Sequence, residues 1–178
     1  IITKENFELA EKRAKKRKSS RRDVIAFEKN LEKNLEEIRL LVVTKQFHTS
    51  PYKSRKIYEP KERIIYILPY APDRIVQHAV MNILVPIMER IFIVDSYACI
   101  ANRGQTKASL RTMEAVRRNK YCLKCDIHHF YPSINQSILS NMYHNKFKDK
   151  DFLEIIDDII FSFPGWYNCP IGNYTSQW

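Results

Sequence analysis

The segment Cys125–Ile134 combines residue types that can hold a metal ion. Asp126 stands near the end of a short apolar run, Tyr121–Ile127, whose composition predicts a β-strand. An acid at the end of an apolar strand is costly to desolvate unless a partner compensates its charge, and a divalent cation is one such partner. The alternative is that Asp126 caps the following turn. The spacing alone leaves both interpretations open.

A second segment, Pro170–Gln177, has the composition of a ligand-binding loop. Gly172 allows the backbone to approach a ligand closely, and Asn173, Thr175 and Ser176 supply hydrogen-bonding groups beside it. A helix N-cap that is reached through a Pro-Gly loop has the same composition. Taken alone, this segment is a weak indication of function.

Together, and in this order, the two segments resemble motifs of the reverse transcriptase family. The stretch from Asp126 to Ile134 is similar to that family's first catalytic palm motif, and Ile171–Gln177 is similar to its following template-and-nucleotide motif. Other segments resemble the fingers of bacterial group II intron and retroelement enzymes: Ile65–Pro69, Asp73–Val80, Ser96–Ala98 and Gly104–Gln105. The resemblance covers nearly all of residues 23–178, and these motifs taken together in order are more specific than any one of them.

The resemblance implies a two-metal polymerase site. Asp126 would be the catalytic carboxylate and bind both Mg²⁺ ions, and the carbonyl of Ile127 would help to hold the ion on the nucleotide side. Tyr131 would lie under the incoming sugar and exclude a 2′-hydroxyl; the alternative is an ordinary core aromatic. The resemblance implies the following nucleotide-binding residues: Lys61, Arg63, Phe130, Tyr131, Ile171, Gly172 and Gln177.

Two of these residues lie on a predicted basic hairpin of the fingers. Lys61 and Arg63 are candidates for gripping the triphosphate, because arginine presents a fork matched to phosphate and lysine a point charge. The predicted register leaves Lys56 or Arg55 as substitutes. A solvated basic face is the alternative to a binding role.

One departure from the family pattern narrows the resemblance. Most reverse transcriptases have Gln-Gly-x-x-x-Ser-Pro where this chain has Ile171 to Gln177, and the form found here is similar to the enzymes of diversity-generating retroelements. Those enzymes copy a template RNA with frequent errors at adenines and act with a small basic accessory protein. The implied partners are therefore template RNA, a DNA primer and its cDNA, deoxynucleoside triphosphates and such an accessory protein. Retron, defence-associated and group II intron enzymes are the alternatives within the family.

Three further patterns look like chemical sites, but their context favours other roles. Cys122 and Cys125 have a zinc-like spacing, but no second pair follows at a suitable distance, so structural cysteines are favoured. The pair His128–His129 falls at variable positions of the resembled motif, which favours surface or template-facing histidines. Asp157–Asp158 precedes the glycine motif inside a helical pattern, so we expect a solvated helix face there rather than the family's second catalytic pair.

The charge of the chain points to a polyanionic partner. Thirty Lys and Arg residues stand against 20 Asp and Glu, a formal net charge of +10. Residues 1–63 hold 18 of the basic residues and 10 of the acidic ones, so most of the excess lies in the first third. The candidate nucleic-acid-binding residues are Lys15, Lys16, Arg17, Lys18, Arg21 and Arg22.

The expected fold class is α+β, with more helix than strand. By resemblance it is a fragment of a right-hand polymerase: a basic N-terminal helix or arm (1–22), helix-rich fingers (23–120) and a partial palm (121–178). We expect it to stop before the second carboxylate pair and to be inactive alone. The patterns predict helices over 3–18, 23–42, 74–93 (kinked or broken at Pro86), 106–118, 136–147 and 149–161, a hairpin within 47–68 that turns at 59–62, a strand at 121–127 and a loop over 164–176.

Cellular context and rival functions follow from the same sequence. Four cysteines without a crowded framework fit a reducing compartment, and the chain shows neither a signal-peptide pattern nor a long apolar run, so a cytoplasmic protein that does not contact membranes is expected. A non-enzymatic RNA-binding module is one rival, and whether Asp126 binds a divalent ion separates the two. An interaction domain is the other, and its binding of a protein partner would be insensitive to salt.

Overall fold

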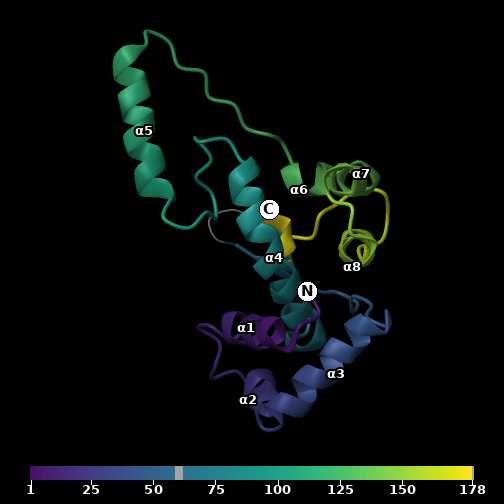
Figure 1. The fold of residues 1–178 in the computed structure, drawn as a ribbon. Helices are drawn as coiled ribbons and strands as arrows, with labels where there is room; N and C mark the ends of the chain where they lie inside the picture. The colour runs from purple at the N-terminus through teal and green to yellow at the C-terminus, as the bar shows by residue number, and fades with distance from the viewer. Residues whose placement is uncertain (59–61, 178) are drawn as a thin grey trace.

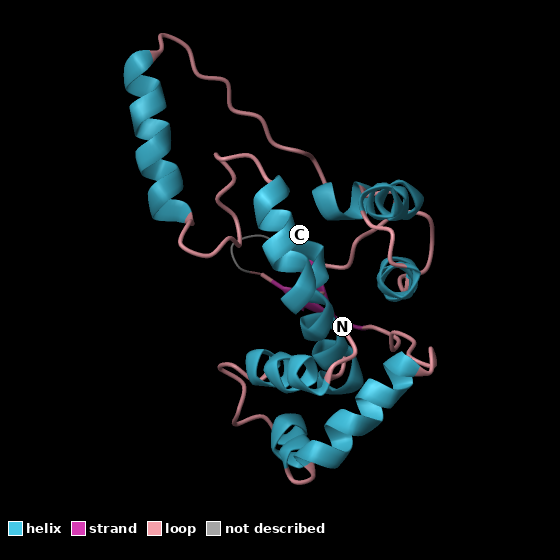
Figure 2. Ribbon diagram, in the orientation of Figure 1, coloured by secondary structure: helices cyan, strands magenta, loops and turns pink. Residues whose placement is uncertain are grey.

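The computed structural model describes residues 1–58 and 62–177, and it is rich in helix with one small sheet (Figure 1, Figure 2). This composition agrees with the α+β class expected from the sequence. Among the described residues, no helix combines the length and the apolar character needed to cross a membrane.

The N-terminal region is built from α1 (Lys4–Ala14), α2 (Arg22–Glu28) and α3 (Leu31–Val43). The expected helix over 3–18 ends four residues early, because the chain turns after Ala14 and Arg17 adopts a φ of 62°. The expected single helix over 23–42 is two helices. They are separated at Asn30, which has a φ of −133° and a ψ of 50°, and the side chain of Asn34 donates to the freed carbonyl of Phe27 over 2.7 Å.

The core surrounds α4 (Ile75–Ile91), which follows a π-helical turn, η1 (Tyr70–Arg74). α1 packs along α4, and its Phe7 and Ala10 are fully buried there. Of the kink or break expected at Pro86, the break does not occur: the helix runs from Ile75 to Ile91. Pro86 is exposed, so water can serve the carbonyl that a proline ring leaves without its helical donor.

The predicted hairpin is confirmed. β1 (Lys53–Ile57) and β2 (Arg63–Ile67) pair antiparallel, with Lys53 opposite Ile67 and Ile57 opposite Arg63. The turn at 59–61, and with it Lys61, lies outside the described residues.

The predicted strand at 121–127 is wrong. The helix α5 (Gln105–Arg118) has no buried residue and stands apart from the other helices (Figure 1), and an extended segment leads from it to the short α6 (Phe130–Ser133). Tyr121 is 90% exposed and Leu123 is 87% exposed. A strand needs a neighbour to pair its backbone groups, and within the described residues the sheet contains β1 and β2 alone.

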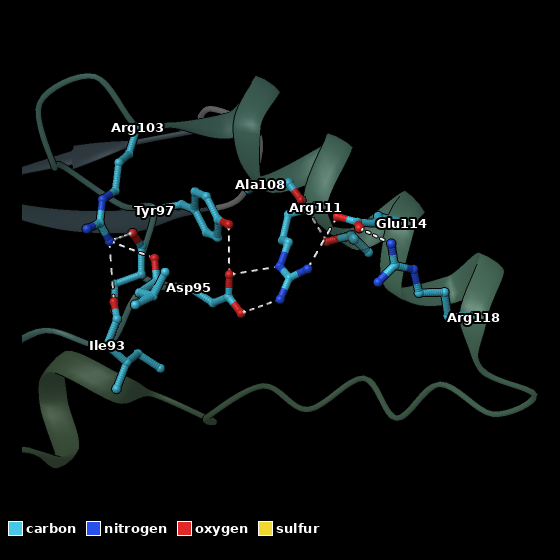
Figure 3. A network of polar contacts seen from close by, with 11 residues as sticks. Ile93, Asp95, Tyr97, Arg103, Ala108, Arg111, Glu114 and Arg118 are labelled. Carbon is cyan, nitrogen blue, oxygen red and sulfur yellow. Dashed lines mark hydrogen bonds and ion pairs between the residues drawn. The ribbon is translucent and has the colours of Figure 1, made fainter.

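A polar network ties the base of α5 to the loop before it (Figure 3). The carboxylate of Asp95 accepts from the guanidinium of Arg111 at 3.1 and 3.4 Å, and from the hydroxyl of Tyr97 at 2.9 Å. One nitrogen of Arg103 donates to three carbonyl oxygens of the same loop. These bonds organise residues 93–111 although α5 buries none of its side chains.

The last helices, α7 (Gln136–Lys146) and α8 (Lys150–Phe161), confirm the predicted pair within a residue at each end. Each begins at a side-chain cap: Asn135 accepts from the backbone N–H of Ile138 at 3.0 Å, and Asp149 accepts from that of Phe152 at 2.9 Å. The chain then runs as a loop to a short 3₁₀-helix, η2 (Thr175–Gln177), a single turn that the sequence did not predict.

Candidate functional site

The two residues before the loop Pro170–Gln177 are bonded to the segment that follows Asp126. The backbone N–H of Cys169 donates to the carbonyl of Tyr131 over 3.0 Å, and the N–H of Asn168 donates to the carbonyl of Ile134 over 2.9 Å. The two motifs, separated by some 40 residues in the sequence, are thus brought together by backbone hydrogen bonds.

The same loop is seated on the finger hairpin. The backbone N–H of Tyr66 in β2 donates to the carbonyl of Ile171 over 2.7 Å. Gly172 has a φ of +127°, and a Cβ added there would lie 2.0 Å from the carbonyl oxygen of Tyr66. Gly172 therefore permits a close backbone approach to the chain's own β2; the approach to a ligand expected from the sequence stays a prediction.

A buried polar chain holds the middle of the loop. Asn173, 4% exposed, donates through its amide to the hydroxyl of Tyr52 over 2.7 Å, and that hydroxyl lies 2.7 Å from the hydroxyl of Ser162. Burial raises the pKa of Tyr52, so the phenol stays protonated and can bond in both directions. The sequence reasoning did not identify Tyr52, and its position beside Pro51 carries no signal for this role.

The end of the loop rests on the first turns of α4. The backbone N–H of Tyr174 donates to Oε1 of Gln77 over 3.0 Å, and the ring of Tyr174 stacks on His78 with centroids 4.3 Å apart. Both residues of α4 are buried, and within the described chain Nε2 of Gln77 and Nδ1 of His78 have no hydrogen-bond partner. Two polar residues inside the apolar run of α4 were the signal that sequence reasoning passed over.

His78 gives the chain a testable pH dependence. Burial, reinforced by the positive charges of Lys18, Arg74 and Arg13, lowers its pKa from 6.5 to about 4. The unfolded chain takes up this proton near pH 6.5 and the folded chain only near pH 4, so the free energy of unfolding falls as the pH is lowered between those values. We expect a loss of about 3 kcal/mol from this group, measured by urea unfolding at pH 7.5, 5.5 and 4.5.

The matched control for this pH dependence is His78→Phe, which keeps a ring against Tyr174 and cannot titrate. Other histidines and carboxylates contribute equally to both proteins, so the difference between their pH profiles isolates His78. Parallel profiles would contradict a buried neutral imidazole.

Asp126 is exposed, on the extended segment between α5 and α6. The expectation that it lies desolvated at the end of a buried strand is therefore wrong, because that strand does not form. Among residues 1–58 and 62–177 no group of three or more His, Cys, Asp or Glu side chains is placed to hold a metal ion. The carboxylate of Asp126 and the carbonyl of Ile127 are oxygen donors of the type that Mg²⁺ prefers, and Mg²⁺ commonly takes only one or two carboxylates beside water and phosphate.

The aromatic pair after Asp126 begins α6. The rings of Phe130 and Tyr131 meet edge to face with centroids 5.3 Å apart; Phe130 is 48% exposed and Tyr131 is half-buried. The chain turns into α6 at His129, whose φ is 49°. His128 and His129 are both exposed, as expected for surface histidines.

The described part of the hairpin presents three cations on one face, Lys53, Arg55 and Arg63. Because Ile57 pairs with Arg63 and side chains alternate along a strand, Arg55 and Arg63 project from the same face. Lys56 projects from the other face and forms an ion pair with Glu62 at 2.8 Å. Of the substitutes considered from the sequence, Arg55 is the one that shares the face of Arg63.

The basic run after α1 is partly neutralised within the fold. Lys15 pairs with Glu11 at 3.3 Å and with Glu28 at 2.8 Å, and Arg21 pairs with Asp23. The other candidate cations have no ion pair with any described residue: Lys16, Arg17, Lys18 and Arg22. Lys18 differs from the other three because it is half-buried.

The pair Asp157–Asp158 is not a solvated helix face. Asp157 accepts from the hydroxyl of Ser140 at 2.6 Å and lies 2.7 Å from His144, which fastens α8 to α7. Asp158 accepts from the backbone N–H and the hydroxyl of Thr49, at 2.8 and 2.6 Å. These bonds explain two adjacent acids on a packed helix, and they leave the pair without a catalytic arrangement.

The cysteine pattern also has no metal-binding geometry. Cys122 and Cys125 are exposed free thiols on the extended segment.

The chain was compared with protein-family models and with curated proteins. Neither comparison finds a match to this chain.

Proposed function

We propose that the chain forms the fingers and the first part of the palm of an RNA-directed DNA polymerase. The observation that supports this most is the seating of the loop Pro170–Gln177. Cys169, directly before the loop, bonds to the carbonyl of Tyr131; the loop itself bonds to β2 through Ile171, and its end rests on α4. The loop is thus joined to the segment that follows Asp126, to the finger hairpin and to α4, which supports a common site for the residues that the resemblance assigns to metal, nucleotide and template.

Roles within this proposal follow from where the side chains lie. Asp126 and the carbonyl of Ile127 would hold Mg²⁺, which when bound supplies charge stabilisation for the attacking and leaving oxygens of nucleotidyl transfer. Arg63, with Arg55 on the same face, would bind the triphosphate through planar guanidinium forks. Exposed Asp126 is accessible to a metal-bound triphosphate.

The test of this function is primer extension on an RNA template by the polymerase that contains this chain, with its sugar selectivity read at Tyr131. We expect Tyr131→Ala to raise the use of ribonucleotides relative to deoxynucleotides by roughly tenfold or more, because the ring would no longer exclude the 2′-hydroxyl. The ratio of kcat/KM for the two nucleotides measures this.

Phe130→Ala is the control for the Tyr131 variant, since it removes the neighbouring ring of the same short helix. If Tyr131→Ala leaves the ratio of kcat/KM for ribonucleotides and deoxynucleotides unchanged, Tyr131 does not exclude the 2′-hydroxyl and is an ordinary packing aromatic.

A finer proposal places the enzyme among those of diversity-generating retroelements. It rests on Ile171 and Gln177, the two positions that depart from the usual family motif. Ile171 offers an apolar, branched side chain where a glutamine could hydrogen-bond near the incoming nucleotide. Errors concentrated opposite template adenines would support this subgroup, and a uniform error spectrum would favour a retron, defence-associated or intron enzyme.

A non-catalytic RNA-binding module is the second candidate. It is favoured by the exposed cations Lys16, Arg17 and Arg22, which form no ion pair with any described residue. Mg²⁺ titration of the chain, followed by the NMR shifts of Asp126 and Ile127, separates the two. Shifts confined to these residues support the polymerase.

A further inference from the structure

A cluster of cations gathers where the turn after α1 meets the start of α4. α1 lies against α4 (Figure 1), and the side chain of Asn6 donates to the carbonyl of Ala79 over 3.1 Å. This packing brings Lys18 and Arg21, which follow α1, close to Arg74 at the start of α4.

Two members of the cluster are half-buried and unpaired. In residues 1–58 and 62–177, neither the ammonium of Lys18 nor the guanidinium of Arg74 has a hydrogen bond or an ion pair. Burial lowers the pKa of Lys18, and the positive charges of Arg74 and Arg21 lower it further. Burial likewise lowers the pKa of Arg74, and the positive charge of Arg21 lowers it further. The fold thus holds like charges together.

The carboxylates nearby relieve this repulsion only in part. The charge of Asp23 raises the pKa of Lys18 and the charge of Asp73 raises the pKa of Arg74, and each effect is smaller than that of the neighbouring cations. Both oxygens of Asp23 accept from the guanidinium of Arg21. Both oxygens of Asp73 accept from Ser50, one from its backbone N–H at 2.7 Å and the other from its hydroxyl at 2.8 Å. Three cations, Lys18, Arg21 and Arg74, face these two carboxylates, so the net charge is positive; it lies at a partly desolvated position, where an anion is held more strongly than in open water.

We propose that Lys18 and Arg74, with Arg21 beside them, bind a backbone phosphate of a single-stranded nucleic acid. The ammonium of Lys18 is a point charge and the guanidinium of Arg74 is a planar fork, and together they can bind the oxygens of one phosphate group. A strand is favoured over a free phosphate because exposed unpaired cations, Lys16 and Arg17, continue from Lys18 along the chain and can contact adjacent phosphates. That this strand is template RNA rests on the proposed function.

The test uses the 178-residue chain and a fluorescent single-stranded RNA oligomer, with affinity measured by anisotropy over a salt series. We expect Arg74→Gln and Lys18→Gln each to weaken binding about tenfold at low salt. Each should also flatten the slope of log affinity against log salt by roughly 0.7. Arg90→Gln, the same charge change at an exposed position in the last turn of α4, should keep the wild-type slope.

A second measurement separates binding from a structural role. Since Arg74 is repelled by its neighbours, Arg74→Gln should leave the melting temperature unchanged or raise it while RNA binding falls. Weaker binding with a lower melting temperature would mean that Arg74 acts through folding, and it would overturn the proposal. An equal loss of RNA binding in Arg90→Gln would also overturn the proposal.

The source of the phosphate is tested with inorganic phosphate. Competition that needs a large excess of inorganic phosphate over RNA supports a strand, whereas tight phosphate binding without RNA binding contradicts it. Failure here is distinguishable from failure of the proposed function. Wild-type RNA binding by the Lys18 and Arg74 variants would remove this site alone, whereas undiminished polymerisation by Asp126→Ala would remove the polymerase assignment alone.

Discussion

Replacing Asp126 with alanine is expected to abolish polymerisation, by a factor of at least ~10³ in the rate of primer extension. The reason is electrostatic: a carboxylate shared by both metal positions would be lost, and the charge that develops on the phosphate oxygens would be left uncompensated. Because Asp126 is exposed and bonds to none of the described side chains, the substitution should not lower the free energy of unfolding. The measurement is single-turnover primer extension on an RNA template, together with a urea unfolding curve.

Asp151→Ala is the matched control for Asp126→Ala. Asp151 is also an exposed carboxylate, 77% exposed, in an ion pair with Lys45 at 2.8 Å on the surface of α8. A solvent-exposed pair of this kind contributes little to stability and lies outside the proposed site, so this variant should extend primers at the wild-type rate. Near-normal extension by Asp126→Ala would falsify the catalytic assignment.

Gly172→Ala is expected to destabilise the chain by roughly 2–5 kcal/mol, the largest loss for any single methyl group that we anticipate. The added Cβ would lie 2.0 Å from the carbonyl oxygen of Tyr66, which is backbone and cannot rotate away, and the φ of +127° is unfavourable to alanine. The loop should therefore lift from β2. Urea unfolding measures the loss, and faster hydrogen exchange at the Tyr66 amide reports its local cause.

Gly165→Ala separates the two contributions to that loss. Gly165 has a φ of +106°, but a Cβ added there meets no atom within 4 Å. It should lose only the conformational contribution, about 1–2 kcal/mol. Equal effects at Gly165 and Gly172 would contradict the close approach of the loop to β2.

Local signals predicted most of the helical fold. Helical patterns such as the apolar spacing of Phe152, Ile156 and Ile159 act within one or two turns, and the helices predicted over 136–147 and 149–161 are present. The caps Asn135 and Asp149 are findings of the structure. The strand at 121–127 failed for the opposite reason. Its apolar residues have the composition of a strand, but a strand is stabilised by pairing with a distant segment, and composition carries no information about whether that partner is in place.

In the candidate site, too, local properties could be predicted from the sequence and long-range contacts could not. The requirement for glycine at 172 could be predicted, because positive φ and close approach are properties of that residue. That the approached group is Tyr66, and that Tyr52, Gln77 and His78 support the loop, depends on contacts between segments about 100 residues apart. The residues of the loop indicate that it makes close contacts, but they do not indicate which segment it contacts.

The seating of the loop on three elements has a thermodynamic consequence. Its bonds to β2, to Gln77 and to Tyr52 are made by consecutive residues, Ile171 to Tyr174, so a displacement that breaks one of them strains the others. Their contributions to stability are therefore not additive, and losing a second anchor after the first costs less than losing it from the intact protein. The cost of a substitution at one of these positions therefore depends on the residues at the others. We expect the hairpin, α4 and the segment after Asp126 to unfold as one cooperative unit.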